Sequence, residues 1–200
     1  MTRKWLFIVL LLLAGWGALS SWRDRGITPP PGVLAPDAPQ QIDLDQGALL
    51  QRGEIRLRTR AHFALTARVL ARERYRFDAG AALAPLDLAL GWGRLSDSAV
   101  LAKIDIRQSN RFFYWHVKDF PIPRREIERS GANMHLIPAD AGVRRAMDRV
   151  RPGQLVRLEG FLVDASRSDG WHWRTSMTRE DTGGGACELV YVESLETVPP

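Results

Sequence analysis

The stretch FALTARVLARERYRF, residues 63–77, alternates small or apolar side chains with polar ones. In an extended chain, one face then carries Phe63, Leu65, Ala67 and Val69. A period of two is typical of a half-buried strand, although the alanines leave a helix open. We therefore expect a long strand at the beginning of a strand-rich domain.

Further strands are expected on both sides of a helix. Residues 100–107 and 111–117 alternate as a hairpin would, with Gln108-Ser109-Asn110 as its turn. Asp140 is the expected N-cap of a short helix that Pro152-Gly153 ends. Three more strands are expected, at residues 155–163, 171–178 and 186–192. This order predicts an α+β, strand-rich fold, either a mixed or antiparallel sheet or a small OB-like barrel, with one or two short helices.

An uncharged apolar run, residues 5–22, comes before the domain, between Arg3-Lys4 and Arg23-Asp24-Arg25. A helix of about 17–25 residues crosses a bilayer, so the run is long enough. It predicts an N-terminal apolar helix, either a signal anchor with its amino end in the cytoplasm or a signal peptide cleaved near Ser20. We expect a single-pass protein of the bacterial inner membrane with its domain in the periplasm or, after cleavage, a secreted periplasmic protein.

Residues 23–40 form a proline-rich linker between this run and the domain. Prolines favour an extended chain of about 3.1 Å per residue, so residues 27–40 predict a spacer on the order of 40 Å long. Residues 41–200 are the right length for a single globular domain. Because Cys187 is the only cysteine, an internal disulfide is excluded.

The charge of the chain allows an anionic partner, although arginine-for-lysine usage in a biased genome, with ordinary solvated faces, explains the same composition. The formal net charge is +5, and eight arginines fall between residues 52 and 76. A basic strand face of this kind suits an anionic envelope polymer, and an envelope protein partner is the alternative. The net charge is small for a nucleic-acid binder, and the expected address is outside the cytoplasm, so nucleic acid is not the expected partner.

Three polar, turn-rich segments are interpreted as loops that carry the binding residues: residues 91–93, 133–139 and 178–183. Loops grouped at one end of a sheet commonly form a binding surface. The candidate binding residues of these loops and of the hairpin turn are Trp92, Arg111, Asn133, His135, Arg179 and Asp181. The alternative for the last segment is a surface ion pair beside a glycine-rich hairpin turn.

No metal, cofactor or complete catalytic set is predicted. His116, His135, His172 and Cys187 are weak candidates for a zinc site because none has a short ligand spacing to another. Cys187 with His135 or His172 as its base would make a thiol nucleophile. The alternative is a structural cysteine at the beginning of an edge strand.

Four segments together resemble a group of uncharacterised bacterial proteins that are short and membrane-anchored or secreted. The segments are LDLALGWG (86–93), QSNR (108–111), NMHLIPA (133–139) and DTGGGACE (181–188), within a likeness over residues 63–193. The resemblance implies an envelope protein and carries no activity. We therefore expect a membrane-tethered extracytoplasmic protein, a binding or accessory module for a membrane partner or envelope polymer. The alternative is a small envelope hydrolase or metal-dependent enzyme that uses His135, His172 and Cys187.

Overall fold

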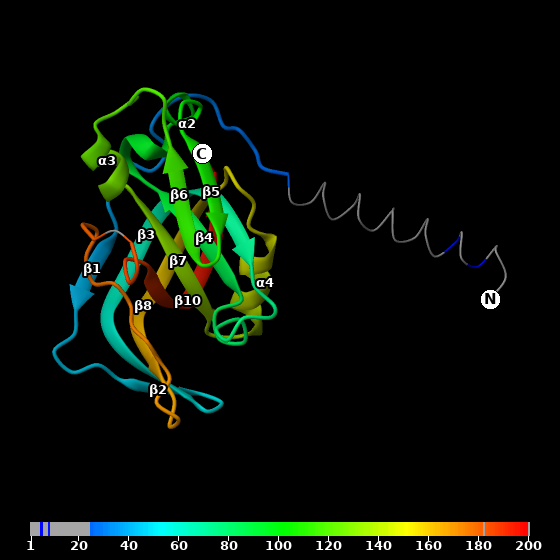
Figure 1. The fold of residues 1–200 in the computed structure, drawn as a ribbon, viewed down its shortest axis with the longest axis vertical. Coiled ribbons are helices and arrows are strands. Elements are labelled where there is room, and N and C mark those ends of the chain that lie inside the picture. Colours follow the sequence, from blue (N-terminus) through cyan, green and yellow to red (C-terminus); the bar gives the residue numbers. More distant parts are fainter. Residues whose placement is uncertain (1–4, 6–7, 9–24, 182, 200) are drawn as a thin grey trace.

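The computed structural model describes Trp5, Ile8, residues 25–181 and residues 183–199 (Figure 1). Apart from Trp5 and Ile8, the apolar run at residues 5–22 lies outside the described residues, as does the cleavage point at Ser20. Within the described part of the chain, no helix has both the length and the apolar character needed to cross a membrane.

The described residues form ten strands and four short helical segments. In chain order these are β1 (Gln40–Asp43), β2 (Leu49–Arg52), β3 (Ile55–Arg74), β4 (Leu86–Gly91), η1 (Gly93–Ser96), α2 (Ser98–Leu101), β5 (Asp105–Ser109), β6 (Phe112–His116), α3 (Arg124–Arg129), β7 (Gly131–Pro138), α4 (Ala141–Arg149), β8 (Leu155–Ser166), β9 (His172–Trp173) and β10 (Glu188–Val198). The prediction of a strand-rich α+β fold with few short helices is confirmed.

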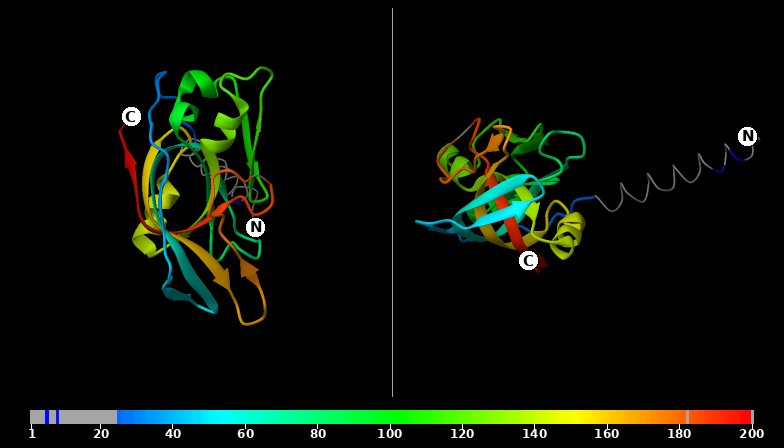
Figure 2. Two further views of the ribbon diagram at one scale, coloured as in Figure 1. Left: turned by 90° about the vertical axis from the view of Figure 1, so that its left-hand side faces the viewer. Right: turned by 90° about the horizontal axis from the view of Figure 1, so that it is seen from below.

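Five strands pair in a closed ring, in the order β3-β4-β7-β10-β8 and back to β3. The β7–β10 pair is parallel and the other four pairs are antiparallel, so the sheet is mixed. The left view of Figure 2 shows the strands curving around a common core. Strands β1 and β2 extend the sheet beside β3, and β9 extends it beside β8.

The long strand β3 can pair on both sides of the ring because it bends. It has 20 residues, and the predicted face, represented by Phe63 and Ala67, is buried in the core. Register shifts occur between Thr59 and Ala61 opposite β8, and between Val69 and Ala71 opposite β4. Irregularities of this kind bend a strand and increase its twist. The alternation around residue 63 therefore predicts the strand on which the ring is built.

The helix predicted after Asp140 is confirmed as α4. The Asp140 side chain accepts hydrogen bonds from the backbone N–H groups of Gly142 and Val143, which otherwise lack partners in the first turn. Val143 and Met147 are one turn apart and are buried against the core. The helix therefore connects β7 to β8 and covers part of the core.

Two of the predicted strands are wrong in their extent. Residues 98–101 are helix α2 and not the beginning of a strand, because the Asp97 side chain accepts from the N–H of Ala99 and caps a helical turn. The strand expected at 171–178 is limited to His172–Trp173. Beyond it, the Thr175 hydroxyl accepts from the N–H of Leu189 and takes the place of a backbone partner.

The interpretation of residues 133–139 as a polar loop is wrong, because residues 133–138 form most of β7, while the segment 91–93 begins at the last residue of β4. Every residue of β4 is buried, as is every residue of β7 except its ends. Strands covered on both faces lose the apolar–polar alternation by which a strand is recognised. Their buried polar residues, Asp87, Asn133 and His135, belong to the candidate site.

The proline-rich segment lies against the domain from Ile27 onward. The N–H of Ile27 donates to the carbonyl of Pro152 over 2.8 Å, and the N–H groups of Leu34 and Ala35 both donate to Ser96 Oγ at 3.0 Å. Residue 40 then begins strand β1. The composition predicts a free spacer, but these contacts hold the segment against the domain.

Candidate functional site

A buried acid–histidine pair lies on the outer face of the ring. Asp87 of β4 and His135 of β7 are directly opposed across the strand pair, and they are 0% and 3% exposed. Their neighbours Leu88 and Met134 point into the core, so the alternation of a strand directs Asp87 and His135 outward. His135 Nδ1 lies 2.9 Å from Asp87 Oδ2, an ion-pair contact that lacks the alignment of a hydrogen bond.

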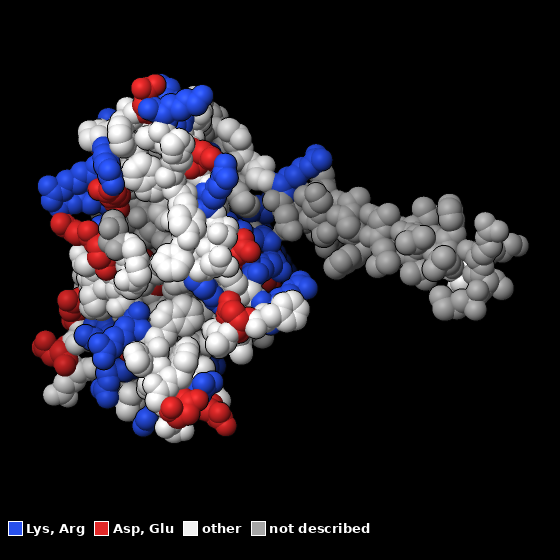
Figure 3. Space-filling model, viewed as in Figure 1, with Lys and Arg blue, Asp and Glu red and all other residues white. Residues whose placement is uncertain are grey.

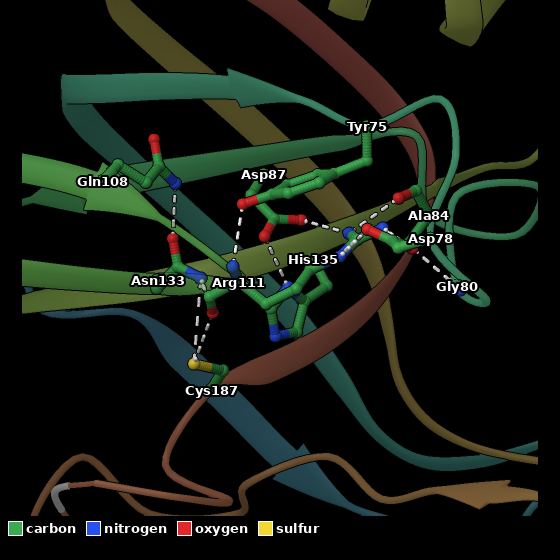
Figure 4. Close-up of polar contacts among 10 residues, drawn as sticks. All are labelled: Tyr75, Asp78, Gly80, Ala84, Asp87, Gln108, Arg111, Asn133, His135 and Cys187. Atoms are coloured by element: carbon green, nitrogen blue, oxygen red, sulfur yellow. Dashed lines mark hydrogen bonds and ion pairs between the residues drawn. The ribbon is translucent and has the colours of Figure 1, made fainter.

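Arg111, at the tip of the β5–β6 hairpin, neutralises this pair from the other side (Figure 4). Its Nη1 donates to Asp87 Oδ1 over 2.8 Å and to the carbonyl of Ala84, while Nε and Nη2 donate to the Asp78 carboxylate. The guanidinium carbon lies 3.7 Å from the centroid of the Tyr75 ring. Four of its five N–H donors are occupied within the protein. Arg111 therefore holds these segments together more than it offers donors to a partner.

The hairpin turn holds Arg111 in place through its backbone. Asn110 and Arg111 have positive φ angles of 52° and 71°, as a two-residue I′ turn requires. The N–H of Arg111 donates to the Tyr75 hydroxyl at 2.8 Å, and its carbonyl accepts from Asn133 Nδ2 at 2.8 Å. Burial raises the pKa of Tyr75 to about 12, and the hydrogen bond from Arg111 lowers the pKa of Asp78. The predicted turn and three separated segments therefore meet at one arginine.

Cys187 joins the same cluster as a neutral thiol. Its Sγ lies 3.6 Å from the carbonyl oxygen of Arg111 and 3.7 Å from Asn133 Nδ2. Burial raises the pKa of Cys187 to about 11, partly offset by the Asn133 side chain. A thiolate, the form that attacks a substrate, is therefore disfavoured near neutral pH.

Two hollows open in front of this cluster. The first, about 600 Å³, lies along residues 74–80 and the hairpin tip, and the second, about 520 Å³, lies over His135 and Cys187. Both are lined by Arg111, His172 and Trp173, so they adjoin, and we call them together the aromatic groove. The aromatic side chains of its lining are Tyr75, Phe77, Phe112, Trp171 and Trp173.

Exposed aromatic and basic side chains lie along the groove. Phe77 is 97% exposed and Phe112 is 37% exposed. On the face shown in Figure 3, an uncharged band runs over the β5–β6 hairpin with charged side chains on both sides. Arg76 lines the first hollow and Arg174 the second, and within the described residues neither has a hydrogen-bond or ion-pair partner. The groove therefore offers ring surfaces and two free positive charges.

A second buried pair lies on the inner side of the ring. Glu188 alternates with Val190, which points into the core, and is 1% exposed; its Oε1 is 2.8 Å from Arg179 Nε. Burial raises the pKa of Glu188 to about 7, and the positive charge of Arg179 opposes that rise. Asp181 accepts a hydrogen bond from the Ser176 hydroxyl at 2.8 Å. The pair ties residues 176–181 to the beginning of β10.

The structure thus separates the candidate residues into four places. Arg111, Asn133 and His135 form one cluster, with His172 and Cys187 lining the hollow in front of it. Arg179 and Asp181 lie with the inner pair, and Trp92 is 3% exposed within the core. His116 lines a different hollow, beside Asp105 and Arg107. Among the described residues, no three His, Cys, Asp or Glu side chains are placed to hold a metal ion.

The sequence reasoning missed Asp87, Asp78, Tyr75 and Trp173 as parts of the site. Asp87 carried a usable signal, because a carboxylate inside the apolar run LDLALG needs a buried partner.

In comparisons with known proteins, no family model, no curated protein and no solved structure matched the chain.

Proposed function

We propose that this chain is a membrane-tethered envelope protein whose domain is an OB-like barrel that binds an acidic envelope polymer in the aromatic groove. The strand order supports the fold assignment. An OB barrel has five strands, and here α4 connects the third strand of the ring, β7, to the fourth, β8. OB barrels bind oligomers on the face of their second and third strands, between the loops after the first and fourth strands.

The position of the groove carries the proposal. Asp87 and His135 lie on the second and third strands, β4 and β7, behind the groove. Residues 75–80, after the first strand, form one wall, and residues 171–174, after the fourth, form another. The groove therefore lies where such a barrel holds an extended ligand.

The chemistry of the lining selects the class of ligand. Flat aromatic side chains stack on the rings of an oligomer, and free guanidinium groups attract its anionic groups. Trp171 and Trp173 meet edge to face with their centroids 6.4 Å apart, and Trp173 also covers the ring of His135. An acidic polysaccharide combines rings with regularly spaced anionic groups. The predicted anchor at residues 5–22 would place the domain among such polymers.

The test is binding by the full-length chain in lipid nanodiscs. Polygalacturonate, neutral dextran and single-stranded DNA are titrated while tryptophan fluorescence is recorded. We expect polygalacturonate to bind more tightly than dextran, and Phe77→Ala to weaken that binding about fivefold, the loss of about 1 kcal/mol of ring contact. Phe120→Ala is the matched control, because Phe120 is 53% exposed and does not line the groove. No binding, tighter binding of DNA, or equal loss in both variants would contradict the proposal.

A hydrolase is the second candidate function, favoured by one observation. His135, His172 and Cys187 line the same hollow, as a shared site requires. The neutral thiol of Cys187 speaks against it as a nucleophile. Turnover of p-nitrophenyl acetate by the full-length chain, abolished in Cys187→Ser and retained in His116→Gln, would favour the enzyme over the binding module.

A further inference from the structure

The two nitrogens of the buried His135 ring have different surroundings. The side chain is 4% exposed, with Nδ1 against Asp87 and the ring centroid 4.7 Å from that of Trp173. No described residue makes a hydrogen bond to Nε2. Figure 4 shows this nitrogen directed away from Asp87, to the side where Cys187 lies, and both residues line the second hollow. Nε2 is therefore the nitrogen of this largely buried ring that is open to the hollow, where an atom of a ligand can reach it.

The contact with Asp87 fixes what Nε2 can do. Although the contact lacks the alignment of a hydrogen bond, a negative carboxylate oxygen 2.9 Å from Nδ1 favours a proton there over a lone pair. In the neutral ring, Nε2 then carries a lone pair and repels an anion. In the protonated ring, Nε2 carries a hydrogen and donates to an anion.

Charged groups lie on both sides of the ring. Behind the ring, the carboxylates of Asp87 and Asp78 share the single guanidinium of Arg111, so a protonated His135 balances the cluster. In front of it, the hollow is lined by the free Arg174 and by His172, Cys187 is a neutral thiol, and no carboxylate is among the described lining residues; Glu188, the first residue of β10, faces Arg179 instead.

We propose that the second hollow is an oxyanion subsite, in which His135 Nε2 and Arg174 bind one carboxylate, sulfate or phosphate group and His135 takes up a proton. The subsite rests on the proposed function, since the anion is a group of the bound polymer. No covalent step is involved. Affinity then falls as pH rises, by up to tenfold per pH unit where one proton is taken up. A ligand hydroxyl donating to neutral Nε2 would give the opposite trend.

The experiment measures binding of inorganic sulfate and of polygalacturonate to the full-length chain from pH 5.5 to 8. Calorimetry in two buffers of different ionisation enthalpy counts the protons taken up. We expect up to one proton per anion and affinity that falls with pH. His135→Gln should abolish this pH dependence, whereas His116→Gln, in a separate hollow, should retain it. His172→Gln should retain it as well, although His172 lines the same hollow.

An independent readout covers the case in which His135→Gln does not fold. In the unmodified chain, the NMR titration midpoint of the His135 imidazole should move to higher pH when sulfate is added. An unmoved midpoint, affinity independent of pH, or affinity that rises with pH would overturn the subsite. Polymer binding without pH dependence would leave the proposed function standing and remove the subsite. Sulfate binding with proton uptake but no polymer binding would remove the proposed function and leave the subsite standing. Sulfate binding without proton uptake would mark an adventitious ion only.

Discussion

Replacing Arg111 with methionine should destabilise the domain far more than replacing an exposed arginine. Asp87 is 0% exposed, and Arg111 is the cation that donates to it over 2.8 Å. Removing one member of a buried ion pair leaves an uncompensated buried charge and costs about 3–5 kcal/mol. The second pair, with the 38% exposed Asp78, adds at most about 1 kcal/mol.

Thermal unfolding of the full-length chain in detergent, followed by tryptophan fluorescence, measures this loss. For a chain of this length, 1 kcal/mol shifts Tm by about 2–4 °C, so Arg111→Met should lower Tm on the order of 10 °C. Arg157→Met is the control, because its pair with Glu196 is exposed and contributes at most about 1 kcal/mol.

A double variant tests the reason for the loss. Asp87→Asn in the Arg111→Met background removes the buried charge and should recover part of the lost stability. Equal Tm shifts for Arg111→Met and Arg157→Met, or no recovery in the double variant, would refute the buried-charge reasoning.

Three further outcomes follow from other parts of the structure. Burial raises the pKa of Glu188 to about 7, above the 4.5 of an ordinary glutamate, so the folded state holds a proton that the unfolded state has lost. Stability should therefore fall by roughly 3 kcal/mol as pH rises from about 4.5 to 7, as measured by urea unfolding; Glu188→Gln should remove this slope, and the exposed Glu196→Gln should not. Ser96→Ala removes the hydroxyl that accepts from the N–H of Leu34, so hydrogen exchange at that amide should accelerate about fivefold or more while the core amides stay protected. Because its pKa of about 11 lies about two units above that of an ordinary thiol, Cys187 should react with iodoacetamide at pH 7 about a hundredfold more slowly in the folded chain than in the unfolded one, and equal rates would contradict its burial.

The parts of the fold that local signals determine could be predicted from the sequence. Alternation around residue 63 predicts β3, and Asp140 followed by a helical face predicts α4. Asn110, the last residue of the predicted turn, tolerates the positive φ that the hairpin needs, although the turn itself is Asn110-Arg111. Each of these signals lies within a few consecutive residues.

The strands at the centre of the site could not be predicted in this way. β4 and β7 are covered on both faces, so neither alternates, and their polar residues looked like loop residues. Asp87 and Arg111 are 24 positions apart, and their contact exists only once the hairpin folds over the ring. Sequence reasoning selected Arg111, Asn133 and His135 as individual residues, but their common acid, Asp87, depends on long-range pairing.

The most direct test of the aromatic groove as the binding surface is photocrosslinking in native membranes. A benzophenone amino acid placed at Phe77, which is 97% exposed on the groove, is compared with the same group at Phe120, exposed elsewhere. The proposal predicts a polysaccharide adduct at position 77 and none at position 120. Equal adducts at both positions, or a protein adduct alone at position 77, would contradict it.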